Sequence, residues 1–117
     1  MLLRREELAS HVASHVGVPI AFAEYGVRVV LSAIGPYLAP ENRALVAQEL
    51  PGKLAAAIDH DVPRRPIDPH WLLPGMRPGQ AHELIATVCR TLATRLSAGA
   101  LTLLREALPP ETARLFR

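Results

Sequence analysis

The chain has 117 residues and a formal net charge of +2, so it is long enough to form one domain with its own core and lacks the strong positive charge of a nucleic-acid binder. Half of the residues are hydrophobic but only 4% are aromatic, which predicts a core of Leu, Val, Ile and Ala side chains between close-packed helices. A single cysteine excludes an internal disulfide and favours a reducing compartment. Charged residues at positions 4–7 stand where a secretory signal needs its apolar run, so we expect a cytoplasmic protein.

Two helices are predicted at the start of the chain. Apolar side chains recur every four positions over residues 4–16, which indicates an amphipathic helix. Residues 20–35 are apolar on nearly all sides, so the second helix should be the most buried one, with Phe22 on its buried face. Glu24 and Arg28 have the i, i+4 spacing that allows an ion pair on the remaining polar face. The prolines and charges in and around this stretch argue against a membrane span.

Two shorter helices and a connector follow. A proline and a glutamate in the first turn are typical of a helix start, which predicts a helix over residues 38–49. Residues 53–58 can form a short closing helix with Leu54 and Ile58 facing inward. Residues 59–79 hold five of the eleven prolines, so they cannot sustain a long helix and should form a connector.

The second half of the chain contains the clearest helical pattern. A strict i, i+4 apolar ladder predicts a long helix over about residues 80–96, and Cys89 lies in this ladder as a small buried hydrophobe. Ser97 is a suitable N-cap for a following helix that ends at Pro109. Residues 112–116 offer a last half-formed turn.

The two halves repeat each other at an offset of 58 residues without a gap. The offset superposes a long helix, a short helix and a Leu-Pro stop. It aligns Ala23 with Ala81, Val27 with Ile85, Val30 with Val88, Ile34 with Leu92, Leu38 with Leu96, Leu50 with Leu108 and Pro51 with Pro109. We therefore predict an all-α single domain, residues 1–117, in which two degenerate helical repeats (about 20–58 and 80–116) pack face to face around a pseudo-two-fold axis, joined by a proline-rich connector (59–79).

The repeated unit has a recognisable form. In the first copy residues 30–38 precede Ala47-Gln48-Glu49-Leu50-Pro51, and in the second copy residues 88–96 precede Arg105-Glu106-Ala107-Leu108-Pro109. These stretches resemble the repeats of the bacterial domain of unknown function 2267 family. The first copy departs from that pattern by an additional glutamate, Glu49, before the leucine. The resemblance implies a helical two-repeat fold and brings no established activity with it.

Residue types suited to metal binding and nucleophilic chemistry are scattered along the chain. Those that can bind a divalent metal lie near the connector, but their spacing matches no known metal signature, and so we expect no metal and no cofactor. They are Asp59, His60, Asp61, Asp68, His70, His82 and Glu83. His11 and His15 have the spacing of a two-histidine clip without a second pair of ligands, so they should be surface residues. Because Cys89 has no activating base in its sequence neighbourhood, we expect no enzyme activity.

The connector carries the candidate site. It combines basic, aromatic and proline residues, types that are common at protein interfaces. The predicted partner-binding residues are Arg64, Arg65, His70, Trp71 and Arg77. The sequence favours a protein-interaction module, or one that self-associates into a homo-oligomer. Two alternatives remain open: weak nucleic-acid binding through the connector arginines, and a metal or small-molecule site at the seam between the repeats.

Overall fold

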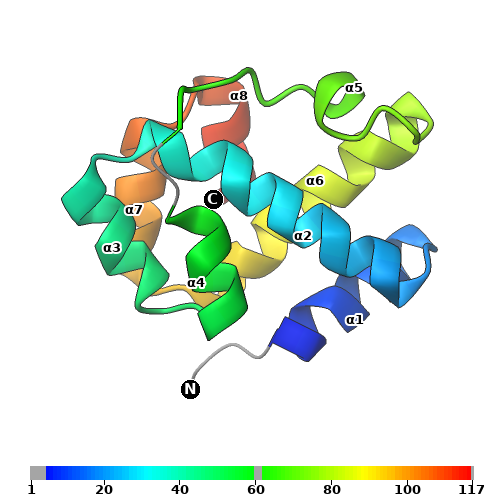
Figure 1. Ribbon diagram of the computed structural model, residues 1–117, viewed down its shortest axis with the longest axis horizontal. Coiled ribbons are helices and arrows are strands. Elements are labelled where there is room, and N and C mark those ends of the chain that lie inside the picture. Colours follow the sequence, from blue (N-terminus) through cyan, green and yellow to red (C-terminus); the bar gives the residue numbers. More distant parts are fainter. Residues whose placement is uncertain (1–4, 60–61, 117) are drawn as a thin grey trace.

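The fold is all-α in the part of the chain that the computed structural model describes, residues 5–59 and 62–116, with the side chains of residues 5, 6, 70 and 71 outside that description. Figure 1 shows the helices wrapped around a single core. The helices are α1 (Arg5–Val16), α2 (Ile20–Ile34), α3 (Pro40–Ala47), α4 (Gly52–Ile58), α5 (Pro69–Leu72), α6 (Pro78–Arg95), α7 (Ala98–Ala107) and α8 (Pro110–Ala113), with 3₁₀ turns η1 (Gly35–Tyr37) and η2 (Arg114–Phe116).

The observed helices match the predicted ones to within a few residues. Gly17 ends α1 in a left-handed conformation with φ of +79°, a geometry that glycine adopts without steric cost. Ser97 caps α7, since its Oγ accepts a hydrogen bond of 3.2 Å from the amide of Ala100. Two details differ: α6 already begins at Pro78, because proline is well suited to the first helical position, and the connector contains the short helix α5.

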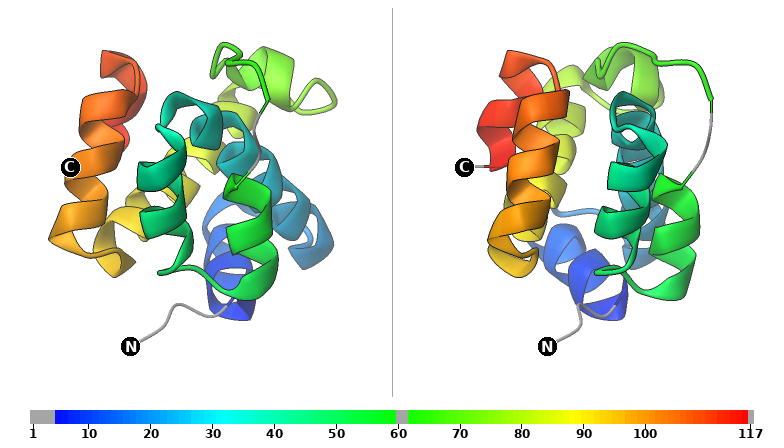
Figure 2. Two further views of the ribbon diagram at one scale, coloured as in Figure 1. Left: turned by 60° about the vertical axis from the view of Figure 1, so that its left-hand side comes forward. Right: turned by 90° about the vertical axis from the view of Figure 1, so that its left-hand side faces the viewer.

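The 58-residue offset recurs in the structure itself. Helices α2, α3 and α4 begin at positions 20, 40 and 52, and α6, α7 and α8 begin at positions 78, 98 and 110. The last turn of α4 ends at residue 58, and η2 ends at residue 116. Figure 2 shows the two copies as neighbouring layers, with α1 beneath both of them. The connector runs along the outside of the first copy before it enters α6 (Figure 1).

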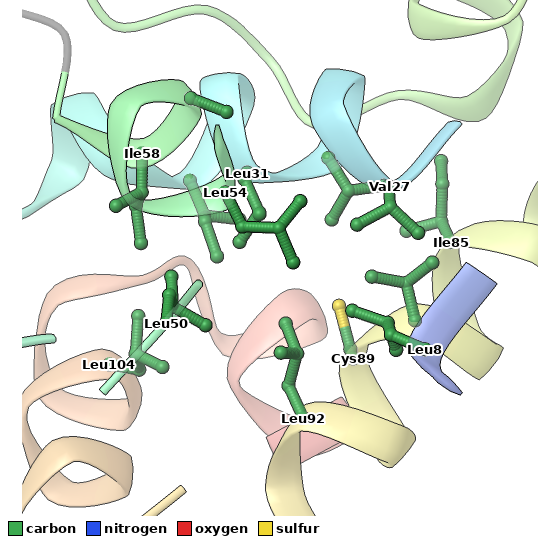
Figure 3. Packing of buried hydrophobic residues seen from close by; sticks show 14 of the residues in the cluster. Leu8, Val27, Leu31, Leu50, Leu54, Ile58, Ile85, Cys89, Leu92 and Leu104 are labelled. Carbon is green, nitrogen blue, oxygen red and sulfur yellow. The ribbon is translucent and has the colours of Figure 1, made fainter. Parts of the chain in front are cut away.

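The core is filled by equivalent positions of the two copies. Figure 3 shows side chains from both copies and from α1 meeting in one apolar cluster. The equivalent pairs that are buried in both copies include Val27 and Ile85, Val30 and Val88, Leu31 and Cys89, Ile34 and Leu92, Leu38 and Leu96, Val46 and Leu104, Leu50 and Leu108, and Ile58 and Phe116. Both copies therefore fold for the same reason, the burial of one Leu-rich face per helix.

The seam between the copies lies where α2 packs against α6. Gly26 and Leu84 are equivalent positions at the 58-residue offset, and they touch each other: a Cβ atom placed on Gly26 would lie 2.6 Å from Leu84 Cδ2. Contact between equivalent residues is what a two-fold axis produces when it passes between them. Glycine on one side makes room for leucine on the other, so the seam is packed.

A second contact joins the copies at the other end of α6. Glu49, just after α3, accepts hydrogen bonds from the Ser97 amide at 2.7 Å (Oε1) and from the Ser97 hydroxyl at 2.6 Å (Oε2). Ser97 in turn accepts from the Ala100 amide. The glutamate that departs from the repeat pattern thus fixes the N-terminus of α7 from the opposite copy, a position where negative charge is favourable.

One prediction about α2 is wrong. Phe22 was expected on the buried face, but 36% of it is exposed, and its neighbour Tyr25 is 48% exposed. The stripe that faces the core is instead that of Ala23, Val27 and Val30. Because α2 is apolar on nearly all sides and only its inner side packs against α1, α4 and α6, its second apolar face remains at the surface.

The lengths of the helices bear on the membrane prediction. In the described residues no single helix is both long and apolar enough to cross a membrane. The segments Glu7–Val16 and Ile20–Tyr37 reach that length and composition only as a pair, and they are bent by 109° relative to each other.

Gly35 supplies the first test of the packing. It is buried, and a Cβ atom there would overlap the backbone carbonyl oxygen of Ile58, which cannot move away as a side chain can. We expect Gly35→Ala to lower the free energy of unfolding by about 3 kcal/mol. The control is Gly99→Ala in α7, where the nearest atom is 3.9 Å away and the change should stabilise by up to about 1 kcal/mol. Urea denaturation measures both, and equal effects would contradict the close approach.

The contact between Glu49 and Ser97 supplies the second test. Ser97→Ala removes a helix cap and should cost about 1 kcal/mol of stability, and Glu49→Ala should cost a similar amount. Because the two side chains bond to each other, a double-mutant cycle in urea denaturation should show a coupling energy of about 0.5 kcal/mol or more. Purely additive losses would mean that the two copies are not joined here.

Candidate functional site

Exposed aromatic side chains lie together on the outer face of α2. Five large hydrophobic residues are exposed in the part of the chain that the structure describes: Ile20, Phe22, Tyr25, Leu45 and Val62. Of these, Phe22, Tyr25 and Val62 border depressions beside α2, whereas Ile20 and Leu45 do not. The rings of Phe22 and Tyr25 meet edge to face, with centroids 6.2 Å apart. A cluster of this kind on a small domain is typical of a binding surface.

A groove continues this surface between α2 and the connector. Its cavity has a volume of about 560 Å³, and it is bounded on one side by α2 and η1 and on the other by the connector. The lining residues are Tyr25, Arg28, Val29, Ser32, Ala33, Pro36, Val62, Pro63, Arg65 and Leu72. Most of them are apolar or aromatic, with two arginines among them, which is the make-up of sites that hold an apolar group and orient it by a few polar contacts.

The connector is fastened to the end of α2 by polar contacts. The Tyr37 hydroxyl donates a 2.7 Å hydrogen bond to the carbonyl oxygen of Arg65, and Arg64 Nε donates to the carbonyl oxygen of Pro36 at 3.2 Å. The Arg64 guanidinium also lies over the Tyr37 ring, 5.5 Å from its centroid. These contacts hold the outer wall of the groove in place. The wall is the connector, a segment that its prolines keep out of a regular helix.

A smaller hollow lies at the other end of α2. It has a volume of about 270 Å³ and is lined by Val18, Pro19, Phe22, Gly75, Met76, Arg77 and Gln80. Phe22 borders this hollow and Tyr25, one helical turn further on, borders the groove, so the two depressions follow one another along the same face of α2. We call the groove and this hollow together the α2 surface.

The predicted site residues divide into three groups. Arg65 borders the groove and Arg77 borders the smaller hollow, whereas the guanidinium of Arg64 is engaged in holding the connector. His70 and Trp71 belong to α5, and their side chains lie outside the described residues.

Sequence reasoning did not identify three residues of the α2 surface as site residues. They are Phe22, Tyr25 and Val29, which recur at positions i, i+3 and i+7. This spacing places them on one face of a helix, and it was the pattern from which a shared surface could have been predicted. Arg28 was expected to pair with Glu24, but no ion pair joins these two described residues in the structure. Arg28 instead lies at the groove.

The remaining described candidate residues border neither depression of the α2 surface. The exposed rings of His11 and His15 stack on α1 with centroids 6.1 Å apart, and His15 Nε2 lies 3.1 Å from Glu83 Oε1. Asp59 Oδ1 lies 3.8 Å from Nε of the buried Arg43. His60 and Asp61 are outside the described residues. Among the residues described, no three His, Cys, Asp or Glu side chains come close enough to hold one metal ion.

Cys89 packs in the core between the two copies (Figure 3). Burial raises the pKa of its thiol to about 12, an effect that the nearby Arg90 charge only partly offsets. The side chain is therefore held as a neutral thiol, and it serves as a packing residue at the position equivalent to Leu31.

Comparison with known proteins finds no relative of this chain. No family model matches the chain, and no curated protein or solved structure matches it. The resemblance to the domain of unknown function 2267 family therefore stays an expectation from the sequence.

The state of Cys89 can be tested by its reactivity. Because a thiolate is the reactive form and the folded protein holds the thiol protonated, labelling by an aromatic disulfide reagent in mildly alkaline buffer should be at least about 100-fold slower for the folded than for the urea-unfolded chain. Stopped-flow absorbance gives both rates. Comparable rates would contradict the burial of this side chain.

Proposed function

We propose that this chain is a non-enzymatic, cytoplasmic helical module that binds a segment of another protein on the α2 surface. The observation that carries the proposal is the exposed edge-to-face pair of Phe22 and Tyr25 beside a preformed groove. Aromatic and arginine side chains in partly enclosed positions are the residues that most often dominate the binding energy of protein interfaces.

The shape of the surface supports a polypeptide as the ligand. Two depressions follow one another along α2, so a partner can place side chains in both, and the groove between α2 and the connector is an open channel and not a deep enclosed cavity. An amphipathic helix that lays its apolar face into such a groove is a common mode of recognition.

Binding to a second copy of the chain is less well supported than binding to another protein. A two-fold dimer through the α2 surface would bring the same patch from both subunits together. The arginines that border the patch would then meet arginines of the other subunit's patch, and like charges at an interface are unfavourable. Self-association through this surface is therefore the less favourable arrangement.

The alternatives predicted from the sequence receive less support. Nucleic-acid binding through the connector would use Arg64, whose guanidinium contacts the carbonyl oxygen of Pro36 and the Tyr37 ring. A site at the seam would need space where Gly26 and Leu84 are in contact. Neither nucleic-acid binding nor a site at the seam is therefore proposed as a second function.

Replacement of one aromatic side chain tests the proposal. Tyr25→Ser should abolish copurification of the partner from host lysate, while the similarly exposed hydrophobic control Leu45→Ser on α3 should retain it. Both sites are exposed, so the free energy of unfolding should change by no more than about 0.5 kcal/mol in either variant. Hydrogen exchange of the complex should show protection of α2 and the connector.

Two results would contradict this proposal. Binding that survives Tyr25→Ser but is lost in Leu45→Ser would place the interface on α3. Light scattering of the purified chain that shows a dimer, disrupted by Tyr25→Ser, would replace the external partner by a second copy.

A further inference from the structure

The described charged residues that line the α2 surface are of one sign. The charged residues that line the groove are Arg28 and Arg65, and the charged residue that lines the smaller hollow is Arg77. No acidic residue lines either depression in the described part of the chain, although the whole sequence holds 11 acidic residues beside 13 basic ones. In a nearly neutral protein, three arginines with no acidic residue among the described lining residues are a local feature of this surface.

The cations border the apolar surface and leave its middle uncharged. The middle consists of Phe22, Tyr25 and Val29 along α2, whereas Arg28 and Arg77 are exposed residues at the two depressions. An apolar strip with a polar rim is the common arrangement of a protein interface, in which the apolar middle supplies affinity and the charged rim selects the partner.

From this arrangement we infer that the natural occupant of the α2 surface is an acidic amphipathic helix, an inference that rests on the function proposed above. Phe22 and Val29 are seven residues apart, which is two turns or roughly 10 Å along α2. Apolar side chains at positions i and i+7 of a partner helix have the same spacing and can enter the smaller hollow and the groove. Asp and Glu side chains beside them then face Arg28 and Arg77.

A polypeptide fits this surface better than a nucleic acid does. The groove contains aliphatic side chains, among them Val29, Val62 and Leu72, which complement apolar side chains of a partner. Single-stranded nucleic acid is held by aromatic platforms along a continuous positive track. Here the cations stand at separate depressions, with Phe22 and Tyr25 packed edge to face against each other.

Selection from a displayed library of random peptides tests the inference directly. The peptides should be about sixteen residues long, roughly four helical turns. Selection on the intact protein should enrich sequences that have apolar residues at i and i+7 and an excess of Asp and Glu over Lys and Arg. Tyr25→Ser should lose these peptides, while Leu45→Ser should keep them.

Charge reversal then tests the role of the arginines. The double variant Arg28→Glu/Arg77→Glu should bind the selected peptides at least about tenfold more weakly, as should the intact protein at high salt. The matched control is Arg90→Glu/Arg95→Glu, which makes the same change in net charge at two exposed residues of α6 that border neither depression. It should change the affinity by less than about twofold. Fluorescence anisotropy with labelled peptides measures each value.

The outcomes separate this inference from the proposed function. Selected peptides that need Tyr25 but show no acidic excess, or that bind the Arg28→Glu/Arg77→Glu variant equally well, would overturn the acidic helix and leave the protein-binding function in place. No Tyr25-dependent peptide at all would overturn both. A single-stranded oligonucleotide that binds in competition with the peptides, and with higher affinity, would assign the surface to nucleic acid and also overturn the inference.

Discussion

At Gly26 the backbone of α2 carries no side chain, and Leu84 of α6 occupies the space that this leaves. This contact fixes how closely the two copies approach, and it requires that equivalent positions differ, since two leucines would collide and two glycines would leave a void. The inner faces of α2 and α6 are therefore packed against each other. Helices α3, α4, α7 and α8 and the turn η2 contribute side chains to the same core.

The α2 surface is a consequence of this packing of α2 against α6. One apolar face of α2 packs on α6, and on a second apolar face Phe22 and Tyr25 remain exposed. The segment that passes over it is the connector, which its prolines keep out of a long helix and which Tyr37 and Arg64 fasten at one end. Such a segment borders α2 but covers too little of it to bury Phe22 and Tyr25.

Much of the fold could be predicted from the sequence, because it depends on local patterns. Apolar periodicity located the long helices, the 58-residue offset located the repeat, and hydroxyl capping chemistry identified Ser97. The orientation of α2 could not be predicted, because both of its faces are apolar and only the packing partner decides which is buried. The burial of Arg43 and the close approach at Gly35 likewise depend on segments distant in sequence. Of the candidate site, composition indicated Arg65 and Arg77. Helical spacing could have placed Tyr25 on one face with Phe22 and Val29, but the groove that Tyr25 and Arg28 line exists only because the connector passes beside them.

The two walls of the groove differ in how strongly the core restrains their amino-acid sequences. Its inner wall belongs to α2, where substitutions are restrained by the core on the other side of the helix. Its outer wall is the connector, whose exposed residues Val62, Pro63 and Arg65 add little to the packing of either repeat. Mutation can therefore change what the groove recognises by altering the outer wall alone, so that related chains can acquire different ligands while they inherit the same core.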